Sequence, residues 1–199
     1  RWIVGQALNG AARVIAACTY TAQLIPQAGY QLSPDKTRII TLGVDTAVFH
    51  PTDTTLPNKK LIHAASLVPV KDQATLLRAL ARLDEAITLD IIGTGSQESY
   101  LRTLAAELGI SQRVRFVGAV PHLNTPAYYQ QAALNILSSR HEGLGMVTLE
   151  AAACGIPTVG TAVGLLPDHS ALGISVPVGD DASLAEAIQN LLDNEEQRA

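Results

Sequence analysis

The amino-acid sequence predicts an α/β fold in which a parallel sheet is covered by helices on both faces. Two observations support this prediction. Short apolar runs with strand character alternate with longer runs of helical periodicity along most of the 199 residues. The composition is apolar, with 47% hydrophobic and 16% charged residues, which suits a sheet buried on both faces.

The strand and helix signals follow one another in regular order. Residues 87–92 (ITLDII) are typical of a buried strand, and Leu101, Leu104 and Leu108 recur at helical spacing before Gly109 ends the helix. Strands are expected at residues 13–18, 37–42, 60–65, 87–92, 113–117, 134–138, 158–160 and 173–176. Helices are expected at residues 21–28, 73–83, 97–108, 126–132, 147–154 and 183–192. In a parallel sheet built this way, ligands bind where the carboxyl ends of the strands meet the loops.

A change in composition divides the chain. Residues 43–58 carry two prolines, a glycine and few apolar residues, which is typical of a linker. We therefore expect one part at residues 1–45, a linker at 46–58 and a domain at 59–199. The chain begins without methionine and stops within the charged tail of a helix, so we expect a fragment.

Charge and cysteine content argue against several classes of protein. The net charge is −4 and aromatic residues make up 4%, so we expect no nucleic-acid partner, which would need a basic surface with stacking rings. Cys18 and Cys154 form neither a CxxC motif nor a metal-type spacing with the histidines, and two buried thiols in a reducing compartment are expected. No apolar run of about 18 residues predicts a transmembrane segment. These features favour a cytoplasmic location.

Residues 139–155 (SRHEGLGMVTLEAAACG) contain the most specific functional signal. Two glycines before a helix let backbone amides approach a ligand closely, and the unpaired amides of a helix N-terminus attract a phosphate. Glu150, about one turn into that helix, can accept hydrogen bonds from a vicinal diol such as a ribose, and Glu142 faces the same mouth. A diphosphate between two sugars would fit this arrangement. The alternative is that both glutamates only flank a solvated helix start.

With two glutamates separated by seven residues, this segment resembles the EX7E motif of glycosyltransferase family 4. Members of that family are retaining enzymes of the GT-B type, with two Rossmann-like domains, and the C-terminal domain binds the nucleotide-sugar donor. The resemblance implies that Glu142 contacts hydroxyls of the donor sugar and that Glu150 holds the ribose. It also implies that the donor's sugar or phosphate lies against the amides of Gly143, Leu144, Gly145 and Met146.

Further segments are similar to family motifs in the same order. Residues 39–51 resemble the interdomain segment, 61–72 the first donor-domain strand with its phosphate loop, and 114–120 the base-facing strand, which ends at Gly118. The similarity covers most of residues 13–192. It implies that residues 59–199 are the GT-B donor-binding domain and that residues 1–45 are the last elements of the acceptor domain.

Three departures from the family pattern concern the donor phosphates and the acceptor. Ser66 stands where the family has arginine, so that Ser66 and Lys71 would hold the diphosphate less strongly unless a cation such as Arg140 replaces it. Asp72 stands where glycine is usual and would weaken the positive field beside Lys71. Residues 164–168 (GLLPD) depart from the loop that faces the acceptor, which leaves the acceptor open.

The activity implied by the resemblance is transfer of a sugar from a nucleoside-diphosphate sugar with retained anomeric configuration. Lys71 and Glu142 would be the catalytic residues. We expect no metal, since no Asp-x-Asp motif is present, and no cofactor besides the donor substrate. A saccharide or lipid acceptor would bind the missing N-terminal domain, through which membrane association is left open. The fragment alone is expected to be inactive.

The sequence also bears on three alternative functions. A dinucleotide site at Gly93-Thr94-Gly95 is disfavoured because Glu98 replaces the third glycine of that fingerprint. A sugar-nucleotide epimerase shares the GT-B fold, although the glutamate spacing favours a transferase. A non-catalytic nucleotide-sugar-binding homologue stays open because of Ser66 and Asp72.

Overall fold

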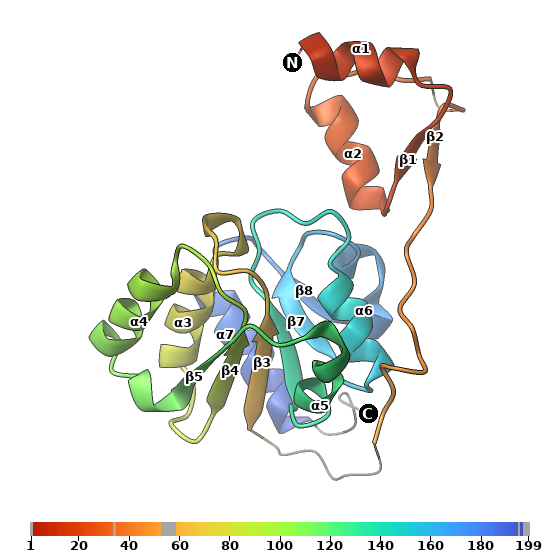
Figure 1. Ribbon diagram of the computed structural model, residues 1–199. Helices are drawn as coiled ribbons and strands as arrows, with labels where there is room; N and C mark the ends of the chain where they lie inside the picture. Colours follow the sequence, from red (N-terminus) through yellow and green to blue (C-terminus); the bar gives the residue numbers. More distant parts are fainter. Residues whose placement is uncertain (1, 34, 53–58, 195, 197–199) are drawn as a thin grey trace.

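The computed structural model describes residues 2–33, 35–52, 59–194 and 196, arranged as a smaller and a larger body (Figure 1). The smaller body contains α1 (Trp2–Gly10), β1 (Val14–Ala16), α2 (Thr19–Gln27) and β2 (Thr37–Ile39), and its two strands form a parallel pair. An extended segment joins it to the larger body (Figure 1). None of the helices described has both the length and the apolar character needed to cross a bilayer.

The larger body is built on a six-stranded sheet in the order β5-β4-β3-β6-β7-β8, in which every neighbouring pair is parallel. Its strands are β3 (Lys60–Ala64), β4 (Thr88–Ile92), β5 (Val114–Gly118), β6 (Leu134–Leu137), β7 (Thr158–Thr161) and β8 (Gly173–Val176). The first three strands extend the sheet in one direction and the last three in the other, so the topology switches between β3 and β6. This confirms the predicted Rossmann-like parallel sheet.

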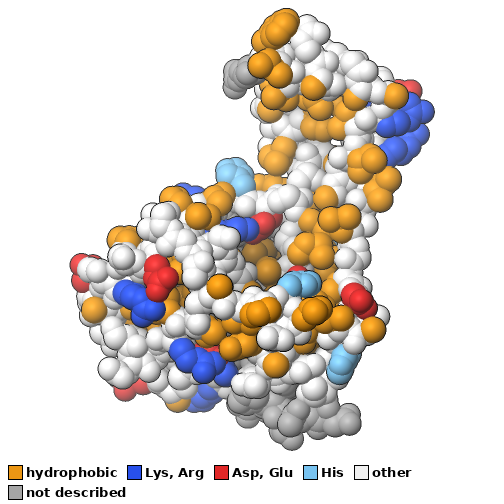
Figure 2. Space-filling model, in the orientation of Figure 1, with side chains coloured by type: hydrophobic (Ala, Val, Ile, Leu, Met, Phe, Trp, Pro, Cys, Tyr) orange, Lys and Arg blue, Asp and Glu red, His pale blue; other side chains and the backbone are white. Residues whose placement is uncertain are grey.

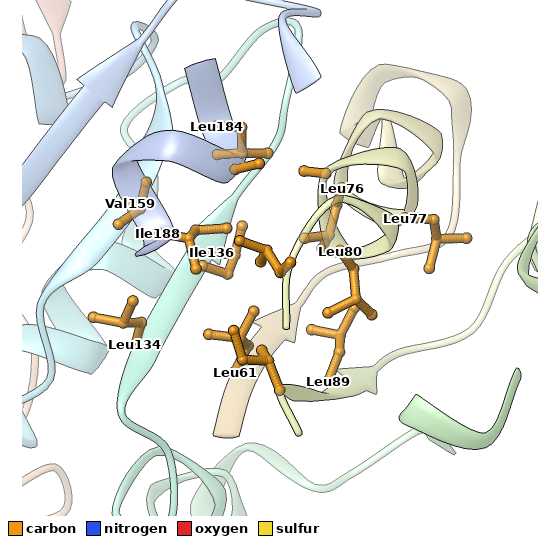
Figure 3. Close-up of a cluster of buried hydrophobic side chains, with 14 of the residues drawn as sticks. Leu61, Leu76, Leu77, Leu80, Leu89, Leu134, Ile136, Val159, Leu184 and Ile188 are labelled. Carbon is orange, nitrogen blue, oxygen red and sulfur yellow. The ribbon is translucent and has the colours of Figure 1, made fainter. Parts of the chain in front are cut away.

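Helices cover both faces of this sheet, as the alternation along the strands requires. The helices are α3 (Gln73–Ala81), α4 (Glu98–Glu107), α5 (Pro126–Tyr129), α6 (Met146–Ala153) and α7 (Asp181–Asp193). On one face α3, α4 and α7 bury a leucine-rich core against the strands, part of which Figure 3 shows. On the other face α5 and α6 bury a second core around Ile62 and Tyr129. In β3, Leu61 therefore faces the first core while its neighbour Ile62 faces the second.

The predicted strands and helices are all present. Five strands are one to three residues shorter than predicted, β5 is shifted by one residue, β7 is one residue longer and β8 matches. The described residues contain one α-helix that was not predicted. The sequence analysis did not predict α1, which carries no buried residue and therefore lacks a core-facing apolar stripe. Cys18 and Cys154 are free and buried, as expected.

The predicted linker at residues 46–58 is partly packed into the larger body. Phe49 is 1% exposed and lies in the second core beside Tyr129, with ring centroids 6.3 Å apart. Residues 53–58 lie outside the described residues. The predicted boundaries of the domains stay a prediction.

Apolar side chains are exposed on the smaller body and on the segment that leaves it after β2 (Figure 2). The exposed residues are Trp2, Ile3, Val4, Ile15, Ile39, Ile40 and Leu42. Their exposed fractions lie between 50% and 76%, which is high for side chains of this type.

Candidate functional site

A pocket opens at the topological switch point, between the loops that follow β3 and β6. In doubly wound sheets ligands bind at this place because the loops from the two central strands diverge there. The pocket has a volume of about 310 Å³. It is lined by Ala64, Ala65, Ser66, Lys71, Glu142, Leu144, Gly145, Met146 and Val147. Six residues of the predicted site therefore meet in one pocket, although 71 positions separate Lys71 from Glu142.

Lys71 and Glu142 form an ion pair in this pocket. The Lys71 Nζ lies 2.7 Å from Glu142 Oε1, and the hydroxyl of Ser139 donates to the same oxygen at 2.6 Å. Among the described residues nothing bonds to Glu142 Oε2, so one oxygen of the carboxylate is available to a ligand. The Lys71 side chain is 24% exposed, so its ammonium is also accessible from the pocket. A cation and a half-free carboxylate side by side can bind an anion and a hydroxyl of one ligand.

The backbone around these two residues is held by several contacts. Lys71 ends the short 3₁₀ helix η1 (Pro69–Lys71), and the Ser138 hydroxyl donates to its carbonyl at 2.9 Å. The carbonyl of Ser139 accepts from the hydroxyl of Thr161 on β7 at 2.6 Å. The loops that follow β3 and β6 are thus tied to each other and to the neighbouring strand, which fixes the relative position of the charged pair.

The loop from Ala65 to Leu67 rests on the glycine turn that follows β4. A Cβ at Gly93 would lie 2.0 Å from the carbonyl oxygen of Ala65, and one at Gly95 would lie 2.3 Å from that of Leu67. The amide of Leu67 donates to the carbonyl of Thr94 at 2.9 Å. The glycines of this turn therefore allow the backbones to approach, and the turn supports the pocket without lining it.

A buried polar network on the protein side of the pocket holds the loop from Ala65 to Leu67. Gln73 donates to the Ser66 carbonyl at 3.0 Å and lies 3.3 Å from His63 Nε2, while His63 Nδ1 bonds the Ile136 carbonyl at 2.9 Å. These partners require the Nδ1–H tautomer, in which Nε2 accepts from the amide of Gln73. Burial lowers the pKa of His63 to about 4, so the ring is neutral near pH 7.

Asp72 and Arg140 are arranged differently from the sequence-based interpretation. The Asp72 carboxylate pairs with Arg140 at 2.9 Å and accepts from the Thr75 hydroxyl at 3.0 Å. Its charge is therefore balanced by Arg140, which corrects the expectation that it weakens the field of Lys71. Arg140 lines a neighbouring pocket and not the one with Ser66 and Lys71, so it is not placed to replace the family's arginine.

The residue type at position 72 also has a backbone consequence. Asp72 has φ 46° and is the only non-glycine residue with positive φ among those described. This left-handed conformation is the one that glycine adopts without strain, which explains why glycine suits this position. Aspartate tolerates it better than most residues because its short side chain bonds locally, here to Thr75.

The residues from Leu144 to Val147, which follow Gly143, form one wall of the pocket. Gly145 has φ 88° and precedes the first residue of α6, and Gly143 has open space where a side chain would be. The amides of Gly143, Leu144 and Gly145 donate to no acceptor within the described part of the chain. Together with the N-terminus of α6 they offer positive ends of peptide dipoles to an anion.

Glu150 lies deeper on α6 and does not line this pocket. Its Oε2 accepts from the hydroxyl of Tyr129 at 3.0 Å, and its Oε1 lies 3.0 Å from Nε2 of His122. Tyr129 is fully buried, and burial followed by the charge of Glu150 raises its pKa well above the usual value, so it stays a hydrogen-bond donor. The carboxylate is thus fixed in orientation by Tyr129, while His122 has a side chain that is 67% exposed.

Besides Glu150, two further predicted residues stand apart from the pocket. Gly143 and Gly118 do not line it, although Gly143 is the neighbour of Glu142 in the chain. Gly118 has φ 83°, and its carbonyl accepts from the Gly93 amide at 2.8 Å. The residues after it, including Val120, pack against the second core, in which Tyr129 lies.

Sequence reasoning missed Ser139, Tyr129 and His122. Ser139 precedes Glu142 by three residues, a spacing at which the side chains can meet, but no motif marks it. Tyr129 and His122 reach Glu150 from other elements, so only the fold brings them together. Within the described residues no three His, Cys, Asp or Glu side chains are grouped to hold a metal ion, and the expected absence of a metal requirement stays a prediction.

An anion-attracting pocket at the switch point of a doubly wound sheet is typical of an α/β domain that binds nucleotides or other phosphorylated ligands. A family model described as glycosyl transferases group 1 matches residues 49–199. The chain belongs to that family.

Individual relatives agree with this assignment. D-inositol 3-phosphate glycosyltransferase of Acidothermus cellulolyticus is 31% identical over an alignment 221 residues long, gaps included. The alignment covers 95% of this chain and 49% of that protein. D-inositol 3-phosphate glycosyltransferase 1 of Catenulispora acidiphila is 33% identical, over 94% of this chain and 52% of that protein. The chain thus spans about half the length of these curated relatives.

Solved structures show the same fold. Sucrose-phosphate synthase from Thermosynechococcus elongatus has a TM-score of 0.87 at 25% identity, covering 99% of this chain and 53% of that one. HepE from Anabaena, in complex with UDP and glucose, has a TM-score of 0.84 at 25% identity, covering 100% of this chain and 58% of that one. These likenesses confirm the GT-B fold class.

Proposed function

We propose that the protein carrying this chain is a retaining glycosyltransferase of family 4 and that this chain binds its nucleoside-diphosphate sugar. The observation that carries the proposal is the meeting of Lys71 and Glu142 in the switch-point pocket. The ammonium suits a diphosphate, and the available Oε2 of Glu142 suits a sugar hydroxyl. Membership of the glycosyl transferase group 1 family supports the same reading.

In the proposed reaction the pocket stabilises charge on the leaving diphosphate. Lys71 and the amides of Gly143, Leu144 and Gly145 would bind the phosphate oxygens as the glycosidic bond breaks. Glu142 would orient the donor sugar and stabilise positive charge at its anomeric carbon. The acceptor hydroxyl would attack the anomeric carbon from the face that the diphosphate leaves and pass its proton to the departing phosphate oxygen, so no covalent intermediate with Glu142 is needed. The reaction needs no metal in this proposal.

Glu150 is assigned to the ribose of the donor. Tyr129 holds one carboxylate oxygen, and the exposed His122 can leave the other oxygen to a ribose hydroxyl. The backbone from Gly118 onward would face the base, since it packs beside this group. UDP is the first candidate nucleotide because the similar HepE structure contains it.

The acceptor is assigned to the part of the protein to which residues 1–45 belong. Exposed apolar side chains on this part fit a body that continues into further structure. We keep a saccharide or lipid acceptor as the proposal. The inactivity of the isolated chain and a cytoplasmic location stay predictions.

The donor-site assignment is tested by calorimetric titration of this chain with UDP, GDP and ADP. One nucleotide should bind, and Lys71→Ala and Glu150→Ala should each weaken it by about ten-fold or more, the loss expected for one charge-assisted contact. Lys59→Ala is the matched control, since Lys59 pairs with Asp84 on the surface, with a side chain 52% exposed. Failure of all three nucleotides to bind the folded chain would contradict the assignment.

The reaction is tested on the intact protein that carries this chain. NMR of the transfer product should show the anomeric configuration of the donor. A changed donor sugar without an acceptor would support the epimerase instead. Tight donor binding without turnover would support the non-catalytic homologue, which Ser66 favours because its exposed hydroxyl stands where the family has arginine.

A further inference from the structure

The smaller body touches the loop that carries Glu142. Figure 1 shows that α2 begins at the end of the smaller body nearest the larger one. Cys18, which precedes α2, is 3% exposed and donates from Sγ to the Gly143 carbonyl at 3.4 Å. It packs in a small apolar cluster with Leu144 and Leu165, so the contact excludes water and is not a loose touching of surfaces.

A second polar contact lies on the other side of Glu142. Tyr20, in the first turn of α2, has its hydroxyl 3.1 Å from Nδ1 of His141. Its ring also packs against the cluster that contains Cys18 and Leu144. The residues before and after Glu142 in the chain are therefore both held by the first turn of α2 and the residue that precedes it.

These anchors matter because the Glu142 side chain has to exchange partners. Its Oε1 is bound to Lys71, and a diphosphate entering the pocket would compete for that ammonium. Once the ion pair opens, Ser139 is the remaining side-chain partner of the carboxylate. The backbone on either side of Glu142 then determines where the carboxylate points.

We propose that Tyr20 and His141 are positioning residues, which hold the Glu142 loop in the orientation that receives the donor sugar. The inference rests on the proposed function, in which Glu142 contacts that sugar. It adds that the donor site is completed by the N-terminal body through a tyrosine–histidine hydrogen bond. His141 acts through Nδ1 toward Tyr20 and not through contact with the donor.

The two nitrogens of His141 allow a sharp test. Asparagine places its amide near the position of Nδ1, whereas glutamine places it near the position of Nε2. His141→Asn should retain the bond to Tyr20, and His141→Gln should lose it. If His141 instead touches the donor through Nε2, the order of the two variants reverses.

One measurement is kcat and KM of the intact protein with UDP-glucose. The other is the dissociation constant of this chain for UDP and for UDP-glucose. If the chain binds another nucleotide, that nucleotide and its sugar conjugate take the place of UDP and UDP-glucose. Tyr20→Phe and His141→Gln should lower kcat by about 3- to 10-fold, the loss expected for one neutral hydrogen bond. They should weaken the nucleotide sugar more than the free nucleotide, while His141→Asn resembles the wild type. Tyr100→Phe is the control, because this tyrosine lies 47% exposed on α4.

Unchanged kinetics in Tyr20→Phe would overturn the inference. So would equal weakening of nucleotide and nucleotide-sugar binding in Tyr20→Phe and His141→Gln together with a lowered melting temperature. Activity that is retained in His141→Gln and lost in His141→Asn would overturn it as well. Absence of transfer by the wild type would refute the proposed function instead. The ratio of the two dissociation constants would then still decide the inference on this chain.

Discussion

Neutralising Glu142 should have opposite effects on nucleotide binding and on sugar transfer. Its carboxylate holds the Lys71 ammonium at 2.7 Å, so a diphosphate that binds Lys71 must compete with it. Glu142→Gln keeps the length of the side chain and an oxygen acceptor for Ser139, but it removes the negative charge. Free nucleoside diphosphate should therefore bind more tightly, while the donor sugar loses its charged acceptor.

The expected size follows from the geometry of the pair. Two unit charges at 4 Å attract by about 4 kcal/mol at an effective dielectric constant of 20. Lys71 is partly exposed, and the glutamine still accepts a weaker bond, so the lower part of the range of about 1.5–3 kcal/mol for charged hydrogen bonds applies. About 1.4 kcal/mol corresponds to a ten-fold change in the dissociation constant.

The assay is calorimetric titration of this chain with the nucleotide that the wild type binds. Transfer by the intact protein should fall by about 100-fold, the effect of losing one transition-state hydrogen-bond partner. Glu98→Gln is the control, because it removes a surface ion pair with Arg102 on α4. Weaker or unchanged nucleotide binding in Glu142→Gln would refute the idea that the two residues compete.

The remaining predictions concern stability. Because the folded-state pKa of His63 is about 4 and the unfolded value about 6.5, the unfolded chain binds a proton first, and the free energy of unfolding should fall by up to about 1.4 kcal/mol per pH unit from pH 6.5 toward 4. Chemical denaturation should show a shallower fall in His63→Gln than in His169→Gln, an exposed control, and equal slopes would contradict this. The free energy of unfolding should be about 1 kcal/mol higher in Asp72→Gly than in Asp72→Ala, as measured by chemical denaturation. Both variants lose the same contacts, and only alanine is strained at φ 46°. Gly93→Ala should destabilise the chain by about 3 kcal/mol or more and weaken nucleotide binding, because its Cβ would clash with the Ala65 carbonyl. The control Gly109→Ala should cost only about 1–2 kcal/mol of backbone strain. Similar melting temperatures of the two variants would count against the role of the turn.

The elements of the fold were predictable because each strand and most helices have a local apolar pattern. Leu76, Leu77 and Leu80 mark α3 by spacing alone, and all three are fully buried. The helix α1 was missed for the converse reason, since no residue of it is buried. The glycine-rich segment around Gly145 was predictable because a left-handed residue before a helix has few alternatives to glycine.

The partners of the site residues were not predictable, because they are set by strands far apart in the sequence. Asp72 follows Lys71 in the chain, yet its carboxylate pairs with Arg140 from the loop after β6. Glu150 was expected from its spacing to Glu142. Its partner Tyr129 reaches it because α5 packs against α6, and His122 reaches it from the turn before α5.

The sequence by itself thus determined the parallel α/β fold and the segments that supply the site, since both depend on local periodicity and backbone conformation. Only the tertiary structure decided that Lys71 and Glu142 form an ion pair in the pocket and that Tyr20 bonds His141. The physical reason is that hydrogen bonds and ion pairs depend on atoms meeting within about 3 Å. That distance is decided by the order of the strands and the packing of the two bodies, which no local pattern encodes.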